Sequence, residues 1–109
     1  MIAIGSDHGG YELKEFLKTY LAGKGIEVLD VGCHSTESCD YPQYAAAVAE
    51  MIQEGKCEKG ILCCGTGIGI SMAANKVRGI RCACCSDCYS AKMTRKHNDA
   101  NMIAMEEIE

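Results

Sequence analysis

Short apolar runs alternate with longer amphipathic stretches along the whole chain. The runs predict five β-strands, at residues 2–5, 27–31, 60–64, 80–84 and 101–105. Apolar residues at helical spacing predict four helices, over about residues 11–24, 41–55, 69–76 and 89–96. Strands that alternate with helices are typical of α/β proteins with parallel sheets. The pattern therefore predicts a three-layer Rossmann-like fold, with a five-stranded parallel sheet and helices on both faces.

The chain shows no linker, internal repeat or low-complexity segment, so we expect residues 1–109 to form a single domain. The last predicted strand is followed by no predicted helix. Part of the apolar sheet face is therefore expected to be bare, and a second copy of the chain is the expected cover.

Charge and hydropathy exclude several classes of partner. The net charge of −4 provides no basic field for nucleic acid or an anionic membrane. No apolar run approaches the roughly 18 residues of a membrane span, and the first residues lack the pattern of a signal peptide. We therefore expect a cytosolic protein that binds neither nucleic acid nor membrane.

Cysteine is abundant, with nine in 109 residues. An odd count without an export signal indicates reduced thiols rather than a disulfide framework. The segment Cys82-x-Cys84-Cys85-x-x-Cys88 resembles metal-ligand spacing. Cys82 and Cys84, however, are predicted on one face of a buried strand, which favours a structural role. A thiol redox or metal-binding function nevertheless stays open as one hypothesis for this protein.

Polar residues gather where two of the predicted strands end. Ser6-Asp7-His8-Gly9-Gly10 follows the first strand, and Cys64-Gly65-Thr66-Gly67-Ile68-Gly69 follows the third. Ligands of parallel sheets bind beyond the carboxyl ends of the strands, near a switch in strand order. We therefore expect Asp7, His8, Cys64 and Thr66 to lie together.

The glycine-rich segment can serve an oxyanion. Its glycines let backbone N–H groups converge at a helix N-terminus, where the dipole also lowers the pKa of a nearby thiol such as that of Cys64. A thiolate beside an oxyanion-binding loop suits proton abstraction next to a carbonyl. The alternative is a tight strand-to-helix turn with no chemistry. Neither a P-loop lysine nor the spacing of a dinucleotide fingerprint is present.

Three further side chains have a structural alternative as well as a functional one. Asp7 and His8 can bind a ligand or cap the first helix. His97 can be a functional residue or a cation at a helix C-terminus. Because its helix runs antiparallel to the strands, His97 is expected at the edge opposite Cys64. If both are catalytic, the site is shared by two chains.

Several motifs together resemble one family over essentially the whole chain. They are Ser6-Asp7-His8-Gly9-Gly10-Tyr11-Glu12-Leu13-Lys14, Asp40-Tyr41-Pro42, Cys64 to Ser71 with Ala74-Asn75-Lys76, Gly79-Ile80-Arg81, Ser90-Ala91, Arg95, and His97-Asn98-Asp99-Ala100-Asn101. This set resembles the type B ribose-5-phosphate isomerases.

The resemblance implies an aldose–ketose isomerase that needs no metal and no cofactor. It interconverts ribose 5-phosphate and ribulose 5-phosphate through a cis-enediol, as a homodimer or a dimer of dimers with shared sites. By this resemblance, Cys64 would be the base, and Thr66 with Gly65, Gly67 and Gly69 would support the enediolate. His97 would open the ring. Asp7 and His8 would hold ring oxygens or the phosphate, and Asn98 would bind a hydroxyl across the subunit boundary.

The resemblance also leaves alternatives. Family members continue past the last strand with an arginine, a helix and a basic segment, whose arginines bind phosphate. This chain ends in Glu106-Glu107-Ile108-Glu109 instead, and its arginines at 78, 81 and 95 do not match those positions. An isomerase of galactose 6-phosphate or allose 6-phosphate is a near alternative. A non-catalytic sugar-phosphate-binding or assembly protein is an alternative of another class.

Overall fold

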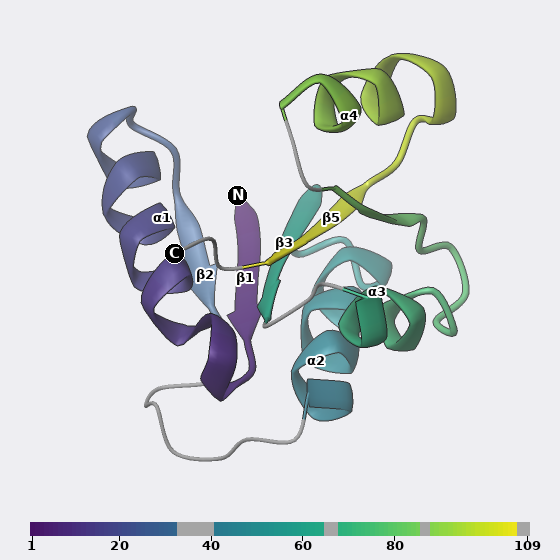
Figure 1. The fold of residues 1–109 in the computed structure, drawn as a ribbon, viewed down its shortest axis with the longest axis horizontal. Coiled ribbons are helices and arrows are strands. Elements are labelled where there is room, and N and C mark those ends of the chain that lie inside the picture. Colours follow the sequence, from purple (N-terminus) through teal and green to yellow (C-terminus); the bar gives the residue numbers. More distant parts are fainter. Residues whose placement is uncertain (33–40, 65–67, 86–87, 107–109) are drawn as a thin grey trace.

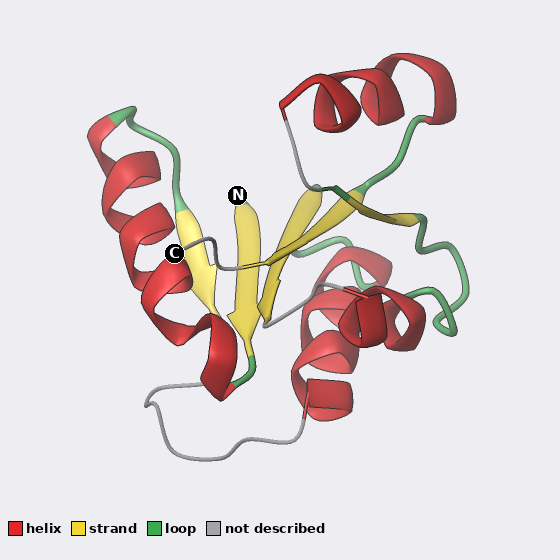
Figure 2. Cartoon of the chain, viewed as in Figure 1, coloured by secondary structure: helices red, strands yellow, loops and turns green. Residues whose placement is uncertain are grey.

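The computed structural model describes residues 1–32, 41–64, 68–85 and 88–106, and its centre is one parallel sheet (Figure 2). The sheet has five strands in the order β2-β1-β3-β5-β4. The strands are β1 (Ile2–Ser6), β2 (Val28–Asp30), β3 (Lys59–Cys64), β4 (Cys82–Cys84) and β5 (Met102–Glu106). All four strand pairings are parallel, so every described strand directs its carboxyl end to the same edge. The predicted fold class is confirmed.

Helices cover the two faces of the sheet unequally. Helix α1 (Tyr11–Gly23) packs on one face, while α2 (Tyr41–Gln53) and α3 (Ile68–Ala74) pack on the other (Figure 1). Helix α4 (Cys88–Met93) stands apart from these three and continues into the π-helix η2 (Thr94–Asn98). None of the described helices is long and apolar enough to cross a membrane.

The observed bounds of most elements lie within two residues of the predicted ones, and two of the differences have a structural meaning. The fourth strand begins at Cys82 rather than at residue 80, because the backbone N–H of Arg81 bonds a side chain, Asn101 Oδ1, and takes no part in the strand ladder. The last predicted helix changes from α to π geometry at Thr94. Apolar spacing does not distinguish these two kinds of turn, since both keep a similar face buried.

The core lies under α2 and α3. Glycines in the strands let α2 approach closely: a Cβ at Gly60 would lie 2.6 Å from Val48, and one at Gly5 would lie 2.9 Å from the same side chain. Alanine and cysteine fill much of the remaining space. The core residues are Ala3, Ala45, Val48, Ala49, Cys57, Leu62, Cys64, Ile70, Ala74, Ile80, Cys82, Met102 and Ala104.

The opposite face is only partly covered by described residues. Beyond α1, a groove of about 310 Å³ separates α4 and η2 from the sheet. Ile2, Ile61, Met102 and Ile103 line it from the strands, with Ala91 from α4. The sequence predicted a bare apolar area on the sheet. The observed groove includes residues of β5, which lies inside the sheet and not at its end.

A buried ion network ties α1 to the end of β2. Lys14 has a fully buried side chain, and its Nζ lies 2.7 Å from Asp30 Oδ2. Lys18 approaches the same oxygen, also at 2.7 Å, while Asp30 Oδ1 accepts a hydrogen bond from the Gly32 N–H at 2.9 Å. The Gly32 carbonyl in turn accepts from the Ser6 N–H at 2.7 Å. The network therefore connects α1 to the residue just before Asp7.

The network shifts the pKa values of its members. Burial alone raises the pKa of Asp30, but hydrogen bonds from Lys14, Lys18 and the Gly32 N–H outweigh it, so the pKa lies below its usual 3.8. The hydrogen bond to Asp30 raises the pKa of Lys18. Both shifts favour the charged forms that the folded chain contains.

Asp30→Asn is expected to lower the free energy of unfolding at pH 7 by about 3 kcal/mol, because it leaves the buried Lys14 ammonium without its main partner. Denaturant unfolding measures this difference. Glu27→Gln removes the same charge from an exposed position and should change stability by less than about 0.5 kcal/mol. Equal losses in the two variants would contradict the role of the ion pair.

The pH dependence gives a second readout of the same pair. The folded-state pKa of Asp30 is depressed, so its stabilisation is present above pH 3.8 and is lost as the pH falls through the folded-state value. The stability difference between the wild type and Asp30→Asn should therefore shrink on acidification below pH 3.8.

Candidate active site

Two strand ends meet at the carboxyl edge of the sheet. Strands β1 and β3 are neighbours, with Ser6 paired to Cys63. The next residues, Asp7 and Cys64, therefore lie at the same edge, and the Asp7 N–H donates to the Cys63 carbonyl at 3.3 Å. The convergence expected for Asp7 and Cys64 is thus what the structure shows.

Asp7 also acts as a cap, the structural alternative to ligand binding, although of the short helix that precedes α1 rather than of α1 itself. It caps the 3₁₀-helix η1 (His8–Gly10), where its Oδ1 accepts from the Gly10 N–H at 3.0 Å. The cap fixes the carboxylate at the sheet edge. Oδ2 has no hydrogen bond to any described residue and can still accept one from a ligand. His8 is exposed beside it.

Gly10 makes the close approach of these segments possible. A Cβ at this position would overlap the Cys63 carbonyl and lie 2.6 Å from the Cys64 backbone nitrogen. Backbone cannot yield as a flexible side chain can, so only glycine fits here. The turn that carries Asp7 and His8 is therefore held directly against the backbone that carries Cys64.

The two cysteines at the end of β3 are both buried. Cys63 is fully inaccessible, and Cys64 is 5% exposed. Cys64 belongs to the core on the α2 and α3 side, and neither cysteine forms a disulfide. Gly65, Thr66 and Gly67 lie outside the described residues. Gly69 lies in the first turn of α3.

His97 and Asn98 lie at the other edge of the sheet. They end η2, which comes shortly before the first residue of β5, Met102, whereas Cys64 pairs with the last residue, Glu106. Four strand steps separate these two levels, a distance of about 13 Å. Within one chain, the structure therefore brings Asp7 and His8 to Cys64 but not His97 or Asn98.

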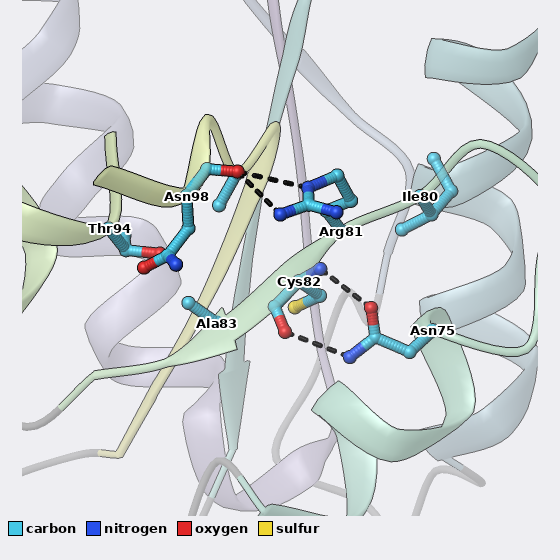
Figure 3. Close-up of a pocket in the computed structure, with 8 residues that line it drawn as sticks. Asn75, Ile80, Arg81, Cys82, Ala83, Thr94 and Asn98 are labelled. Atoms are coloured by element: carbon cyan, nitrogen blue, oxygen red, sulfur yellow. Dashed lines mark hydrogen bonds between the residues drawn. The ribbon is translucent and has the colours of Figure 1, made fainter. Parts of the chain in front are cut away.

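A hollow of about 480 Å³ opens beside this second group (Figure 3). The Arg81 guanidinium reaches the Asn98 carbonyl there, and the Asn75 side chain holds the Cys82 backbone through bonds at 2.7 and 2.8 Å. Sequence reasoning matched Asn75 and Arg81 only as parts of motifs. Neither received a function, because both contacts depend on which loops meet at the start of β4.

The cysteine cluster on β4 is not the buried one expected. Cys82 and Cys84 do share a face, but β4 is an edge strand, so Cys84 is exposed. Burial, with smaller contributions from neighbouring Cys84 and Cys85, raises the pKa of Cys82 to about 12. Within residues 1–32, 41–64, 68–85 and 88–106, no group of three or more His, Cys, Asp or Glu side chains is arranged to hold a metal ion.

Gly10→Ala is expected to lower the free energy of unfolding by at least about 2 kcal/mol, since the new methyl group must displace the backbone of β3. Gly23→Ala is the matched control, because a Cβ there has nothing within 4 Å. That change should be neutral or stabilise by up to about 1 kcal/mol. Denaturant unfolding of both variants checks this, and a stable Gly10→Ala protein would contradict the described contact.

The comparisons with known proteins agree with one another. A family model described as Ribose/Galactose Isomerase matches residues 2–108. Ribose-5-phosphate isomerase B of Escherichia coli is 50% identical over 103 residues, which cover 94% of this chain and 69% of that protein. D-erythrulose-4-phosphate isomerase of Pectobacterium atrosepticum is 48% identical over 105 residues, covering 95% of this chain and 69% of that protein.

A comparison with solved structures points to the same family. That of Clostridium thermocellum ribose-5-phosphate isomerase B matches with a TM-score of 0.96 and 55% identity, over 97% of this chain and 72% of that one. The chain therefore belongs to the ribose/galactose isomerase family of sugar-phosphate isomerases.

Proposed function

We propose that this protein interconverts ribose 5-phosphate and ribulose 5-phosphate by proton transfer through a cis-enediol, without metal or cofactor. One observation carries the proposal: the Asp7–Gly10 turn is held against the end of β3, beside Cys64. This arrangement brings the Asp7 carboxylate and the backbone that carries Cys64 to the edge where ligands of parallel sheets bind. Family membership supplies the reaction class.

The first step opens the sugar ring, and we assign it to His97. The anomeric hydroxyl loses its proton, the bond from C1 to the ring oxygen breaks, and the ring oxygen gains a proton. The product is the open-chain aldehyde. Histidine suits both transfers because its ordinary pKa lies near neutrality.

The second step moves a proton from C2 to C1, and we assign it to Cys64. Its thiolate removes the proton at C2, and the electron pair forms the enediolate, whose charge rests on O1. Donors from Thr66 and the backbone of Gly65, Gly67 and Gly69 would stabilise that charge. The thiol returns the proton to C1 while the proton on O2 passes to O1, which gives the ketose.

Substrate binding is assigned to the remaining polar residues. Asp7 is half-buried, and none of the described residues donates a hydrogen bond to its Oδ2, so it suits a sugar hydroxyl rather than the like-charged phosphate. Exposed His8 can hold a ring oxygen or the phosphate. Asn98 would bind a substrate hydroxyl across the subunit boundary.

The complete site then needs two copies of the chain. The length of β5 separates His97 and Asn98 from Cys64, so one chain cannot bring them to one sugar. A partner copy can present its own η2 at the carboxyl edge of the first. We therefore propose a homodimer, or a dimer of such dimers, with sites shared between subunits.

The sugar itself is part of the proposal. The relatives carry names for a five-carbon and a four-carbon sugar phosphate, so the same family machinery accepts more than one chain length. Ribose 5-phosphate is our first candidate because the Asp7–His8 and His97–Asn98 pairs are both present. Allose 6-phosphate, galactose 6-phosphate and erythrulose 4-phosphate form the comparison panel.

Cys64→Ser is expected to lower kcat for ketose formation from ribose 5-phosphate by at least about 10³-fold, because a hydroxyl is a far weaker base than a thiolate. Coupled detection of ribulose 5-phosphate measures it. Cys84→Ser makes the same atomic change on the edge strand and should keep wild-type turnover. Equal activity of the two variants would contradict the assignment of Cys64. A folded wild type inactive on every sugar in the panel would favour the non-catalytic binding protein.

A further inference from the structure

We propose that Arg81 is a positioning residue for ring opening. Its guanidinium fixes the turn that carries His97 and Asn98, although it stands at the start of β4 and outside that turn. The inference rests on the proposed function only in assigning ring opening to His97. The contact itself is a property of the fold and can be tested without any substrate.

The contact uses two donors on one acceptor. Arg81 Nε and Nη2 donate to the Asn98 carbonyl at 3.0 and 2.6 Å (Figure 3). The last carbonyls of a helix have no partner within the helix, and Asn98 is the last residue of η2. A planar guanidinium fills that gap with a fixed orientation, because both bonds must point to the same oxygen.

Arg81 is itself held firmly to the sheet. Its backbone N–H donates to Asn101 Oδ1 at 2.9 Å, and its carbonyl accepts from the backbone N–H groups of Asn101 and Met102 at 3.1 and 3.3 Å. The Asn101 amide also donates to the Gly79 carbonyl at 2.9 Å. The guanidinium therefore extends from a backbone that is bonded to the first residue of β5.

The turn that Arg81 holds has an unusual backbone. Residues Thr94–Asn98 form a π-helix, and Asp99 follows it in the left-handed region with φ of 52°. Both features are uncommon and persist where surrounding contacts stabilise them. Removal of the two bonds to Asn98 is therefore expected to loosen the turn and to displace the neighbouring His97 imidazole.

Direct contact with substrate is the competing role for Arg81. Its Nη1 group takes no part in the described bonds, so a phosphate could occupy it. That role would raise KM for every phosphorylated substrate. A positioning role would lower kcat for ribose 5-phosphate, whose ring must open, and spare steps on the open chain.

The experiment compares Arg81→Gln with Arg78→Gln, which removes the same charge from an exposed neighbour. Turnover of ribose 5-phosphate should fall by about 10- to 100-fold in Arg81→Gln, with Arg81→Lys intermediate and Arg78→Gln unchanged. At saturating ribulose 5-phosphate, which has no ring, exchange of its C1 hydrogen with deuterated water should stay within about twofold. Raised KM for both substrates, or exchange lost in step with turnover, would overturn the proposal.

A double variant shows whether Arg81 acts through His97. In the His97→Asn background, the further change Arg81→Gln should alter turnover by less than about twofold, since the group it positions is gone. If the double variant instead loses turnover by the product of the two single losses, the proposal is overturned.

Amide hydrogen exchange gives a readout that needs no activity. Arg81→Gln should speed exchange in residues 94–101 relative to Arg78→Gln, while the rest of the sheet keeps its protection. Unchanged exchange there overturns the positioning contact, whatever the enzyme does. Faster exchange in a protein that turns over none of the sugars supports the contact and rejects the proposed function instead.

Discussion

The close approach of the Gly10 turn to the end of β3 is the constraint on which the candidate site depends. A side chain at Gly10 would overlap the backbone of Cys63 and Cys64, so the two segments are at contact distance. Parallel pairing of β1 and β3 sets their level, and the Asp7 cap fixes the turn between them. Asp7, which is proposed to bind the substrate, and Cys64, the proposed base, thus lie at one rigid edge of the sheet. The turn is supported from behind by Lys14 and Asp30, which connect α1 to the backbone next to Ser6.

The parallel direction of the strands decides where the rest of the proposed machinery lies. Because β4 and β5 run parallel, the chain must return to the amino edge after β4, and η2 ends there. His97 and Asn98 are therefore separated from Cys64 by the sheet itself. Arg81 then holds the turn that carries His97 and Asn98, and the close contact at Gly10 holds the turn that carries Asp7. In the proposed dimer each subunit contributes a preorganised half, so catalysis depends on assembly as well as on folding.

Much of this could be predicted from the sequence, because local periodicity determines it. The continuous apolar run of β3 and the glycine turns around it located the strand ends, and with them Asp7 and Cys64. Nonlocal contacts could not be read in the same way. The ion pair from Lys14 to Asp30 spans 16 positions and the bond from Arg81 to Asn98 spans 17, and neither leaves a periodic signal. Strand order has no periodic signal either, so the interior place of β5 and the exposed edge at Cys84 were not anticipated. Thr66 stays a prediction outside the described residues.

The most direct measurement is complementation between two variants that each lack one of the proposed catalytic groups. Cys64→Ala and His97→Asn proteins would be mixed in equal amounts, allowed to exchange subunits, and assayed with ribose 5-phosphate. If each site takes Cys64 from one chain and His97 from the other, half of the dimers are mixed, and each mixed dimer has one intact site. The account predicts recovery of about one quarter of wild-type turnover. No recovery, with mixed dimers verified by mass, would contradict a site shared between subunits.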